Sequence, residues 1–368
     1  MIGVLNIYLL KRHLSGLALA LLAATALVVL GDFIELNRRS SAARHDDTPV
    51  LLMLALHVPS IVGKTLPFVV LLGSLTAFLR LARSSELVVT RAAGVSVWRL
   101  LLWPTLMAMA LGTLAFAVWN PIASAALARY ETLESRYFLG QDSQLSISDD
   151  GLWLRQSVGG VQTVINAGAS SLDGQELADI DVYQFAEDGV QTRRMTAQRA
   201  TLKEAHWLFE DVAVWTFTRT GGSLLATPGQ IDEMQIPTDL TAARILEGFA
   251  PPETLGFWYL PDFIERMEAS GFSSVRHRLY QQTELSRPVM FAAMVLLAAG
   301  FAMRHVRFGS VGQRVLLCVL VGFGLFFLSD FTQALGAAGT VPVYIAAWVP
   351  PVAALMLATA LLLHLEDG

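Results

Sequence analysis

The sequence predicts an α-helical membrane protein with six transmembrane helices and an inserted β-jelly-roll domain. Of its 368 residues, 54% are hydrophobic and only 15% are charged, whereas soluble domains usually carry about a quarter charged residues. Charge is scarce before about residue 128 and after about residue 288, and the middle third has the composition of a soluble protein. A membrane protein with one water-soluble insertion explains this division.

Six segments are apolar enough to cross a bilayer, whose ~30 Å core needs about 20 helical residues. They are residues 14–34, a stretch within 50–79, and residues 100–123, 289–303, 315–329 and 343–363. Pro59, Lys64 and Pro67 interrupt the second segment, which we expect to be kinked, tilted or projecting. Lys11 and Arg12 precede an uncharged run of 18 residues without a small-residue cleavage site. We therefore expect a retained first helix rather than a signal peptide.

The stretch between Arg129 and Arg287 contains no uncharged run of spanning length and must lie on one side of the membrane. Short runs of β-forming residues, such as 161–165 and 180–183, alternate with turn sequences that contain glycine. This spacing is typical of an antiparallel sandwich or jelly roll. We divide the chain into helices 1–3 at residues 1–128, the β domain at 129–254, and connecting helices with helices 4–6 at 255–368.

Positive charge predicts the orientation of the chain. Basic residues precede the first helix and fill the connections between helices 2 and 3 and between helices 4 and 5, namely Lys11, Arg12, Arg80, Arg83, Arg91, Arg99, Arg304, Arg307 and Arg314. If six helices alternate, all three places lie on one side, and excess positive charge marks the cytoplasm. Both termini are then cytoplasmic, and the β domain lies outside the cytoplasm.

Several classes of function are excluded. The single cysteine, Cys318, cannot form an internal disulfide or a redox pair. A net charge of −5 without a basic tract argues against nucleic acid as a partner. Val62-Gly63-Lys64-Thr65 resembles the end of a P-loop, but Val58 stands where the first glycine is required. The histidines lack metal-ligand spacing, and no GxSxG elbow is present. We expect no catalytic residue, cofactor or metal in this chain.

Residues 83–94 form a cytoplasmic segment that is too short to span the membrane and too apolar for a plain loop. Ser84 or Ser85 can cap a helix here, Glu86 suits the positive end of the helix dipole, and Gly94 can end the helix. A short helix that offers Leu87 and Val88 is suited to docking a partner. The alternative is an interfacial helix that only turns the chain.

The sequence SELVVTRAAGVS after LLGSLTAFLRLAR resembles the coupling helix of the lipopolysaccharide export permeases of the LptF/LptG type. The similarity extends to Tyr8-Leu9-Leu10-Lys11-Arg12 before the first helix and to Gly151-Leu152-Trp153 at a predicted strand. It ends with Val341-Pro342-Val343 and Trp348-Val349-Pro350-Pro351 around the sixth helix. SELVV followed by AAG is more similar to the G-type than to the F-type subunit.

The resemblance implies a heterodimer with an F-type paralogous permease subunit in the inner membrane of a Gram-negative bacterium. It implies a cytoplasmic ABC ATPase dimer docked on the coupling helices, and a periplasmic β domain that passes lipopolysaccharide to bridge proteins with similar jelly rolls. Glu86 occupies the place of the coupling-helix glutamate, and its neighbours Arg83, Leu87, Val88 and Arg91 complete the expected ATPase contact. The jelly roll is expected to hold acyl chains in an apolar groove, with candidate lining residues Trp153, Phe185, Trp207, Phe209, Trp215 and Phe217.

Arg38, Arg39 and Lys64 are the candidate lipid-binding residues. A lysine within a membrane span costs about 2.5–3.5 kcal/mol on insertion scales, which makes a functional role the default interpretation. Lipid A phosphates are natural partners for such cations. Arg38 and Arg39 match basic residues of the family, whereas Asp32 stands where the family has a lysine. The alternatives are a helix-end anchor for the arginines and a snorkelling Lys64.

The sequence leaves two other classes of function open. A proton-driven secondary transporter would use Asp32, Lys64 and Asp330 as a relay. A membrane-anchored scaffold would use its β domain only to bind proteins, and Glu86 would then be replaceable.

Overall fold

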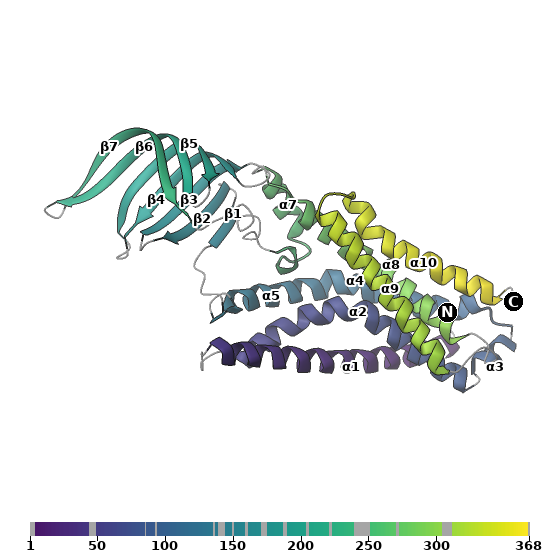
Figure 1. The fold of residues 1–368 in the computed structure, drawn as a ribbon. Helices are drawn as coiled ribbons and strands as arrows, with labels where there is room; N and C mark the ends of the chain where they lie inside the picture. Colours follow the sequence, from purple (N-terminus) through teal and green to yellow (C-terminus); the bar gives the residue numbers. More distant parts are fainter. Residues whose placement is uncertain are drawn as a thin grey trace. The chain divides into compact units, whose positions relative to one another are not determined.

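The computed structural model describes most of the chain. The described residues are 4–43, 49–84, 86–92, 94–134, 137–138, 144–148, 151–158, 161–170, 175–186, 190–203, 206–220, 223–238, 251–269, 272–303 and 311–366. The chain divides into two compact units (Figure 1). A helical unit comprises Met1–Phe138, Glu253–Trp258 and Val275–Gly368, and a β unit comprises Leu139–Pro252 and Tyr259–Ser274.

The helical unit contains six helices that are long and apolar enough to cross a membrane. Its elements are α1 (Val4–Ala43), α2 (Val50–Arg83), the short α3 (Glu86–Ala92), α4 (Val97–Leu114), the π-helical turn η1 (Ala115–Trp119), α5 (Asn120–Glu134), α8 (Val275–Ala302), α9 (Val311–Ala337) and α10 (Val343–Glu366). The third span runs without a break through α4, η1 and α5. The predicted fold class, a helical membrane protein with an inserted β domain, is confirmed.

Several helices are longer than the apolar segments that predicted them. α1 has 40 residues and α8 has 28, and at 1.5 Å per residue both exceed the ~30 Å hydrocarbon core. α8 begins at Val275, fourteen residues before the segment predicted from residue 289, because the polar turns that precede the apolar run are helical too. These extensions carry many of the charged side chains of the helical unit.

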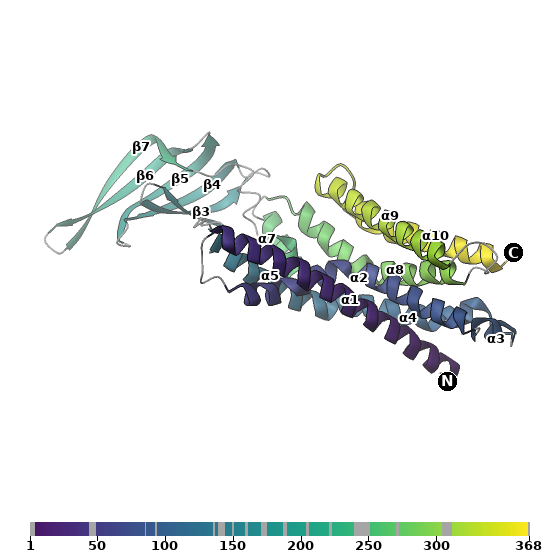
Figure 2. The same cartoon turned by 60° about the horizontal axis from the view of Figure 1, so that its bottom comes forward.

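α8 is the centre of the helical unit. In its apolar window 72% of the residues are buried, against 6% in that of α1, and its partners are α2, α4, α9 and α10. Small residues on α8, including Ala292, Ala293 and Ala298, are completely or almost completely buried, which allows neighbouring helices to approach closely. Figure 2 shows α1 at one side of the bundle, away from α10.

α1 crosses α2 at a pair of glycines. A Cβ atom added to Gly16 would lie 2.5 Å from the carbonyl oxygen of Gly73, and one added to Gly73 would lie 2.7 Å from Cα of Leu17. Next to this crossing, Ser74 Oγ lies 3.1 Å from Nε2 of the buried His13. The two helices are therefore in backbone contact near the N-terminal end of α1.

Gly16→Ala is expected to destabilise the protein, because the new methyl group must push α1 away from a backbone oxygen that cannot move by itself. Overpacking of this kind costs about 1–3 kcal/mol. The matched control is Gly31→Ala on the same helix, where an added Cβ meets nothing within 4 Å. Thermal unfolding in detergent should show a lower midpoint for Gly16→Ala and an unchanged or higher one for Gly31→Ala. Equal midpoints for both variants would contradict the close crossing.

The β unit contains one antiparallel sheet whose seven described strands follow one another in chain order. The strands are β1 (Gln144–Ser148), β2 (Gly151–Val158), β3 (Val161–Ser170), β4 (Glu176–Phe185), β5 (Gln191–Lys203), β6 (His206–Thr220) and β7 (Ser223–Pro237). Sequential hairpins explain why glycine-containing turns punctuate this region. The sandwich expectation implied two facing sheets, whereas the described strands join into one.

One face of the sheet is buried along its length. Leu154, Ile165, Val182, Met195 and Val214 lie opposite one another on neighbouring strands, and all five are buried. A flat single layer would leave such a face in water. Figure 1 shows that the sheet is curved, and twisted, curved sheets can enclose the apolar side chains of one face.

Hydrogen bonds between strands that are not neighbours close this curve. Gln156 on β2 donates to the carbonyl oxygen of Pro237 at 3.2 Å and accepts from Thr238 Oγ1 at 2.6 Å. Trp207 and Phe209, two of the six predicted groove residues, are on the buried face. Trp153 and Trp215 alternate with buried neighbours and therefore lie on the opposite face, half-buried. In the same unit, α7 (Leu260–Ala269) buries Leu260, Phe263, Ile264 and Met267.

Candidate functional site

The short helix α3 lies at the same end of the helical unit as both chain termini (Figures 1 and 2). It begins at Glu86 and ends at Ala92, and Gly94 follows with a φ of +83°, a conformation that favours glycine. The predicted helix is thus present, although Arg83 is the last residue of α2 rather than part of α3. The side chains of Leu87, Val88 and Arg91 lie outside the described part of the structure.

Glu86 is held by hydroxyl groups from two other segments. Its Oε1 accepts hydrogen bonds from Ser84 Oγ at 2.8 Å and from the hydroxyl of Tyr8 on α1 at 3.1 Å. Thr90 Oγ1 donates to the carbonyl oxygen of Glu86 at 2.6 Å. The carboxylate is half-buried and has a defined position at the start of α3.

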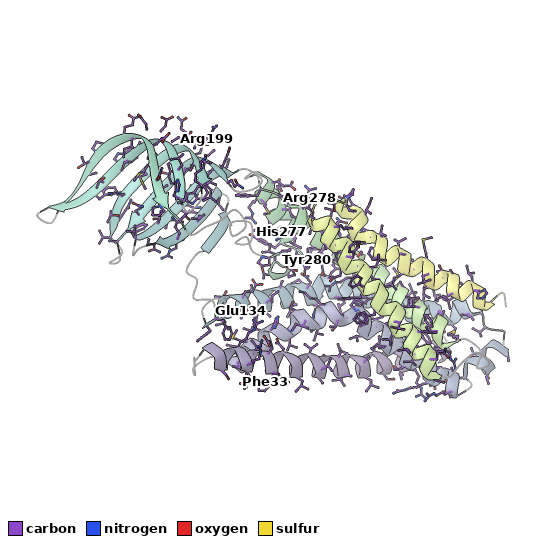
Figure 3. All side chains as sticks on the ribbon, in the orientation of Figure 1. Phe33, Glu134, Arg199, His277, Arg278 and Tyr280 are labelled. Atoms are coloured by element: carbon purple, nitrogen blue, oxygen red, sulfur yellow. The ribbon has the colours of Figure 1, made fainter. Side chains whose placement is uncertain are left out.

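A cluster of charged residues gathers at the other end of α1, where Figure 3 shows Glu134. Glu35 accepts from Arg38 at 3.0 Å and from Arg39 at 2.8 Å, and Arg39 also donates to Glu134 of α5 at 2.9 Å. The two predicted lipid-binding arginines therefore already have carboxylate partners. Their side chains are 73% and 46% exposed, and exposed ion pairs contribute only about 0–1 kcal/mol, so an incoming phosphate can replace these partners.

Asp32 is paired as well. Its carboxylate lies 2.9 Å from Nδ1 of His57 on α2, and the His57 ring stacks on Tyr130 of α5 with centroids 4.2 Å apart. α1, α2 and α5 are thus joined by polar and aromatic contacts at this end. Among the described contacts no hydrogen bond or ion pair joins Asp32, Lys64 and Asp330 into a relay.

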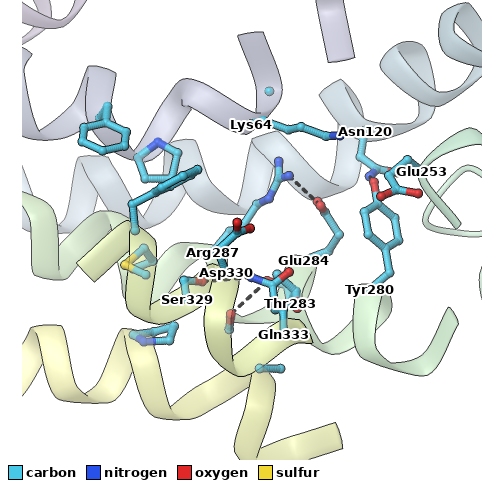
Figure 4. A pocket seen from close by; sticks show the side chains of 18 of the residues that line it. Lys64, Asn120, Glu253, Tyr280, Thr283, Glu284, Arg287, Ser329, Asp330 and Gln333 are labelled. Atoms are coloured by element: carbon cyan, nitrogen blue, oxygen red, sulfur yellow. Dashed lines mark hydrogen bonds and ion pairs between the residues drawn. The ribbon is translucent and has the colours of Figure 1, made fainter. Parts of the chain in front are cut away.

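A cavity of about 280 Å³ lies inside the helical unit (Figure 4). Its polar wall includes Lys64, Arg287, Glu284 and Asp330, and its apolar wall includes Phe68 and Phe326. A second cavity of about 290 Å³ is lined by Lys64 together with His57, Tyr130 and Glu134. Lys64 borders both cavities, and Glu134, which lines the second, pairs with Arg39. Arg38 pairs with Glu35, and neither arginine is among the lining residues of the two cavities.

Sequence reasoning missed the ion pair at the centre of the first cavity. Arg287 Nη2 lies 2.6 Å from Oε1 of Glu284, whose side chain is 0% exposed. Lys64, by contrast, has no hydrogen bond or ion pair among the described residues. The pair precedes the apolar run from residue 289, where hydropathy gives no signal. The spacing of an acid and a base three positions apart is the one sequence signal for it, because such residues are neighbours on a helix.

The segment Glu253–Trp258, which belongs to the helical unit, completes the cavity wall. Glu253 lines both cavities, and the segment 253–258 is fastened to the third span. The backbone N–H of Phe257 donates to Asn120 Oδ1 at 2.9 Å, and the indole of Trp258 donates to the carbonyl oxygen of Ala117 at 3.0 Å. Ala117 lies in η1, and π-helical turns are frequent at functional sites because they disturb the regular hydrogen-bond ladder.

The residues that line the first cavity combine charged and apolar side chains, as a binding region for an amphiphile would. Within the described ranges, no three His, Cys, Asp or Glu side chains converge as metal ligands would. Cations and carboxylates lie beside an aromatic wall formed by Phe68 and by Phe323 and Phe326 of α9, with ring centroids 5.8 and 5.4 Å from Phe68. Such a wall suits hydrocarbon, and the cations suit anionic groups.

Comparison with known proteins agrees with this arrangement. The sequence model described as "Lipopolysaccharide export system permease LptF/LptG" matches residues 7–364. The chain is 25% identical over 371 residues to the lipopolysaccharide export system permease protein LptG of Escherichia coli strain K12, with 98% of both chains covered. It is 24% identical over 356 residues to the protein of the same name from Haemophilus influenzae, with 95% of both covered. The chain therefore belongs to the LptF/LptG family of lipopolysaccharide export system permeases.

Proposed function

We propose that this chain is the G-type, non-catalytic permease subunit of an ATP-driven transporter that extracts lipopolysaccharide from the inner membrane. The observation that carries the proposal is family membership over residues 7–364, together with a short helix between α2 and α4 that presents an ordered glutamate. ATP hydrolysis takes place in a separate cytoplasmic ABC ATPase dimer that docks on α3 through Glu86, Arg83, Leu87, Val88 and Arg91.

The remaining partners follow from the same proposal. An F-type paralogous subunit completes a heterodimer, and periplasmic jelly-roll bridge proteins receive the lipid from the β unit. Both termini and α3 face the cytoplasm, which agrees with the basic residues at the ends of the helices. The β unit is periplasmic, and its buried apolar face supports a role in carrying acyl chains.

Transport requires a site that binds the lipid better in one conformation than in another. Lys64, Arg38 and Arg39 supply cations for the lipid phosphates, and the aromatic wall at Phe68 supplies an apolar surface. The arginines form ion pairs with carboxylates. Lys64 forms no ion pair within the described ranges, although Glu131 lies near enough to interact with it electrostatically, and Lys64 is therefore the residue most ready to receive a phosphate.

The proposal is tested by purifying the tagged full-length chain from its native membrane. We expect recovery of an ABC ATPase and a second permease subunit, and ATP-dependent release of lipopolysaccharide from proteoliposomes of the recovered complex. Transport that persists after removal of every ATPase would favour the proton-driven alternative. Recovery of periplasmic proteins without either partner and without lipid release would favour the scaffold alternative.

Lys64→Gln is expected to reduce lipid contact more than Arg38→Gln, because Lys64 borders both cavities whereas Arg38 is highly exposed and already paired. A charge-assisted contact of this type contributes about 1.5–3 kcal/mol, so lipid occupancy should fall roughly tenfold or more. The measurement is ultraviolet crosslinking of lipopolysaccharide to a photoreactive residue at position 61, next to the site. Lys11→Gln is the control, because Lys11 lies at the N-terminal end of α1, away from the cluster at Asp32, Glu35 and Arg39. An unchanged adduct yield for Lys64→Gln would refute the assignment of Lys64.

A further inference from the structure

The N-terminal sequence Tyr8-Leu9-Leu10-Lys11-Arg12 has a structural partner that its position in the chain does not reveal. Tyr8 donates its hydroxyl hydrogen to Glu86 Oε1 at 3.1 Å, across a separation of 78 residues. Arg12 Nε donates in turn to the Tyr8 hydroxyl oxygen at 3.0 Å, and its guanidinium lies 5.4 Å from the centroid of the Tyr8 ring. A chain of donors therefore runs from Arg12 through Tyr8 to Glu86.

Tyr8 and Glu86, two members of this chain of donors, are anchored by further contacts. The next residue, Leu9, is buried in the core cluster together with Phe78 and Leu81 of α2, and the Tyr8 ring packs against the same cluster. Ser84, directly after α2, gives Glu86 Oε1 its second hydrogen bond at 2.8 Å. Successive donors polarise one another, so a charged donor at Arg12 strengthens the bond from Tyr8 to the carboxylate. A half-buried phenol held in this way is a fixed point for α3.

The hydrogen bonds from Tyr8 and Ser84 leave one oxygen of Glu86 for another partner. Both described hydrogen bonds to the carboxylate end on Oε1, and no described contact occupies Oε2. A carboxylate accepts bonds at both oxygens. Fixing the first oxygen removes side-chain rotations that a partner would otherwise have to freeze on binding, which lowers the entropic cost of docking.

We infer that Tyr8 and Arg12 are positioning residues that orient Glu86 for its ATPase and fasten α3 to α1. This inference has two parts. The docking half, that Tyr8 and Arg12 orient Glu86 for the ATPase, rests on the proposed function. The fastening half, that they attach α3 to α1, rests on geometry alone. α1 runs from this contact to the cluster at Asp32, Glu35 and Arg39. A displacement of α3 therefore reaches the helix that carries the lipid-site arginines directly, and not only α2 and α4, which flank α3 in the chain.

The fastening half is tested on the full-length chain in lipid nanodiscs without any ATPase. Tyr8→Phe removes the hydroxyl and keeps the ring, so packing in the core cluster is retained. We expect backbone amide exchange in α3 and at Val95, whose N–H donates to the Thr90 carbonyl oxygen, to become roughly tenfold or more faster, as expected for loss of one hydrogen bond to a charged group. The control is Tyr344→Phe, an exposed tyrosine on α10. Equal exchange rates for Tyr8→Phe and the unsubstituted chain would overturn the fastening role.

The docking half is tested by a double-mutant cycle that measures the affinity of the cytoplasmic ATPase for Tyr8→Phe, Glu86→Gln and the combined variant. Tyr8→Phe should weaken binding about three- to tenfold when Glu86 is present and should have no further effect in the Glu86→Gln background. Arg12→Gln should behave in the same way, with Arg80→Gln as its control. Additive losses would overturn the positioning role, because they would mean that Tyr8 acts independently of Glu86.

The cycle separates the inference from the proposed function. If Glu86→Gln weakens binding while Tyr8→Phe leaves it unchanged, the positioning role is overturned and the docking function stands. If neither variant changes the affinity, the docking function fails together with the positioning role, and the exchange measurement then decides the fastening role by itself.

Discussion

Glu86→Lys is expected to abolish binding of the cytoplasmic ATPase and, with it, ATP-driven lipopolysaccharide export. The substitution removes the acceptor for Tyr8 and Ser84 and places a second cation beside Arg12, which donates to Tyr8 at 3.0 Å. Truncating one member of a hydrogen-bonded charge pair at an interface costs about 2–5 kcal/mol, which is on the order of 30-fold or more in affinity. Charge reversal adds repulsion to that loss.

The measurement is the amount of ATPase recovered with the tagged chain, followed by lipid release from proteoliposomes. Glu265→Lys is the matched control, because it makes the same charge reversal at an exposed position on α7 of the β unit. Full ATPase recovery and normal export by Glu86→Lys would refute the coupling role of α3 and favour the interpretation of this helix as a mere turn of the chain.

Arg287→Met is expected to destabilise the helical unit strongly, and by more than Gly16→Ala does. It leaves the Glu284 carboxylate, which is 0% exposed, without its paired counterion in the wall of the first cavity. Removing one partner of a buried ion pair costs about 3–5 kcal/mol because the remaining charge is desolvated and uncompensated. The unfolding midpoint in detergent should fall by roughly 4–6 °C for a chain of this size.

The combination of Glu284→Leu with Arg287→Met should recover most of this loss, since replacing both members of a buried pair by apolar residues is often neutral or stabilising. Arg276→Met, at an exposed position on the same helix, is the control for loss of an arginine. If the combined variant is as unstable as Arg287→Met alone, the unpaired carboxylate is not the source of the instability.

The helices and the place of the β unit in the chain were predictable from sequence because each depends on local composition. An apolar run of spanning length has one stable solution in a bilayer, and all six runs became helices. The helix ends were harder to predict. At α8, for example, the helix extends through polar residues that lie outside the apolar run, and hydropathy does not reveal such an extension. Strand periodicity separates two faces but does not say which is inner, and Asp179 and Asp211, with φ of 51° and 55°, interrupt the alternation. Which face of the sheet carries Trp153 and Trp215 could therefore be determined only from the structure.

The sequence pattern singles out candidate site residues, but it does not specify their contacts. Lys64 stands out because cations within a membrane span are rare, and Arg39 because it follows the first span on the side predicted to lie outside the cytoplasm. The partner of Arg39 is Glu134, 95 residues away, and that of Glu86 is Tyr8, 78 residues away. No local pattern specifies which of many carboxylates or hydroxyls will meet a given side chain, since helix packing over the whole unit decides it.

The central position of α8 has a consequence for biosynthesis. The chain is made from the N-terminus, so α1, α2 and α4 leave the ribosome before the β unit, and the helix with the most buried window leaves after it. The early helices must enter the bilayer on their own hydropathy, and α1, the least buried, has the most apolar window of the six. The contact between Gly16 and Gly73 is available as soon as α2 emerges, whereas the contact between Gly112 and Pro288 of α8 must wait. Insertion is thus early and packing late, and the unfinished bundle must persist while more than a hundred residues of β unit are synthesised.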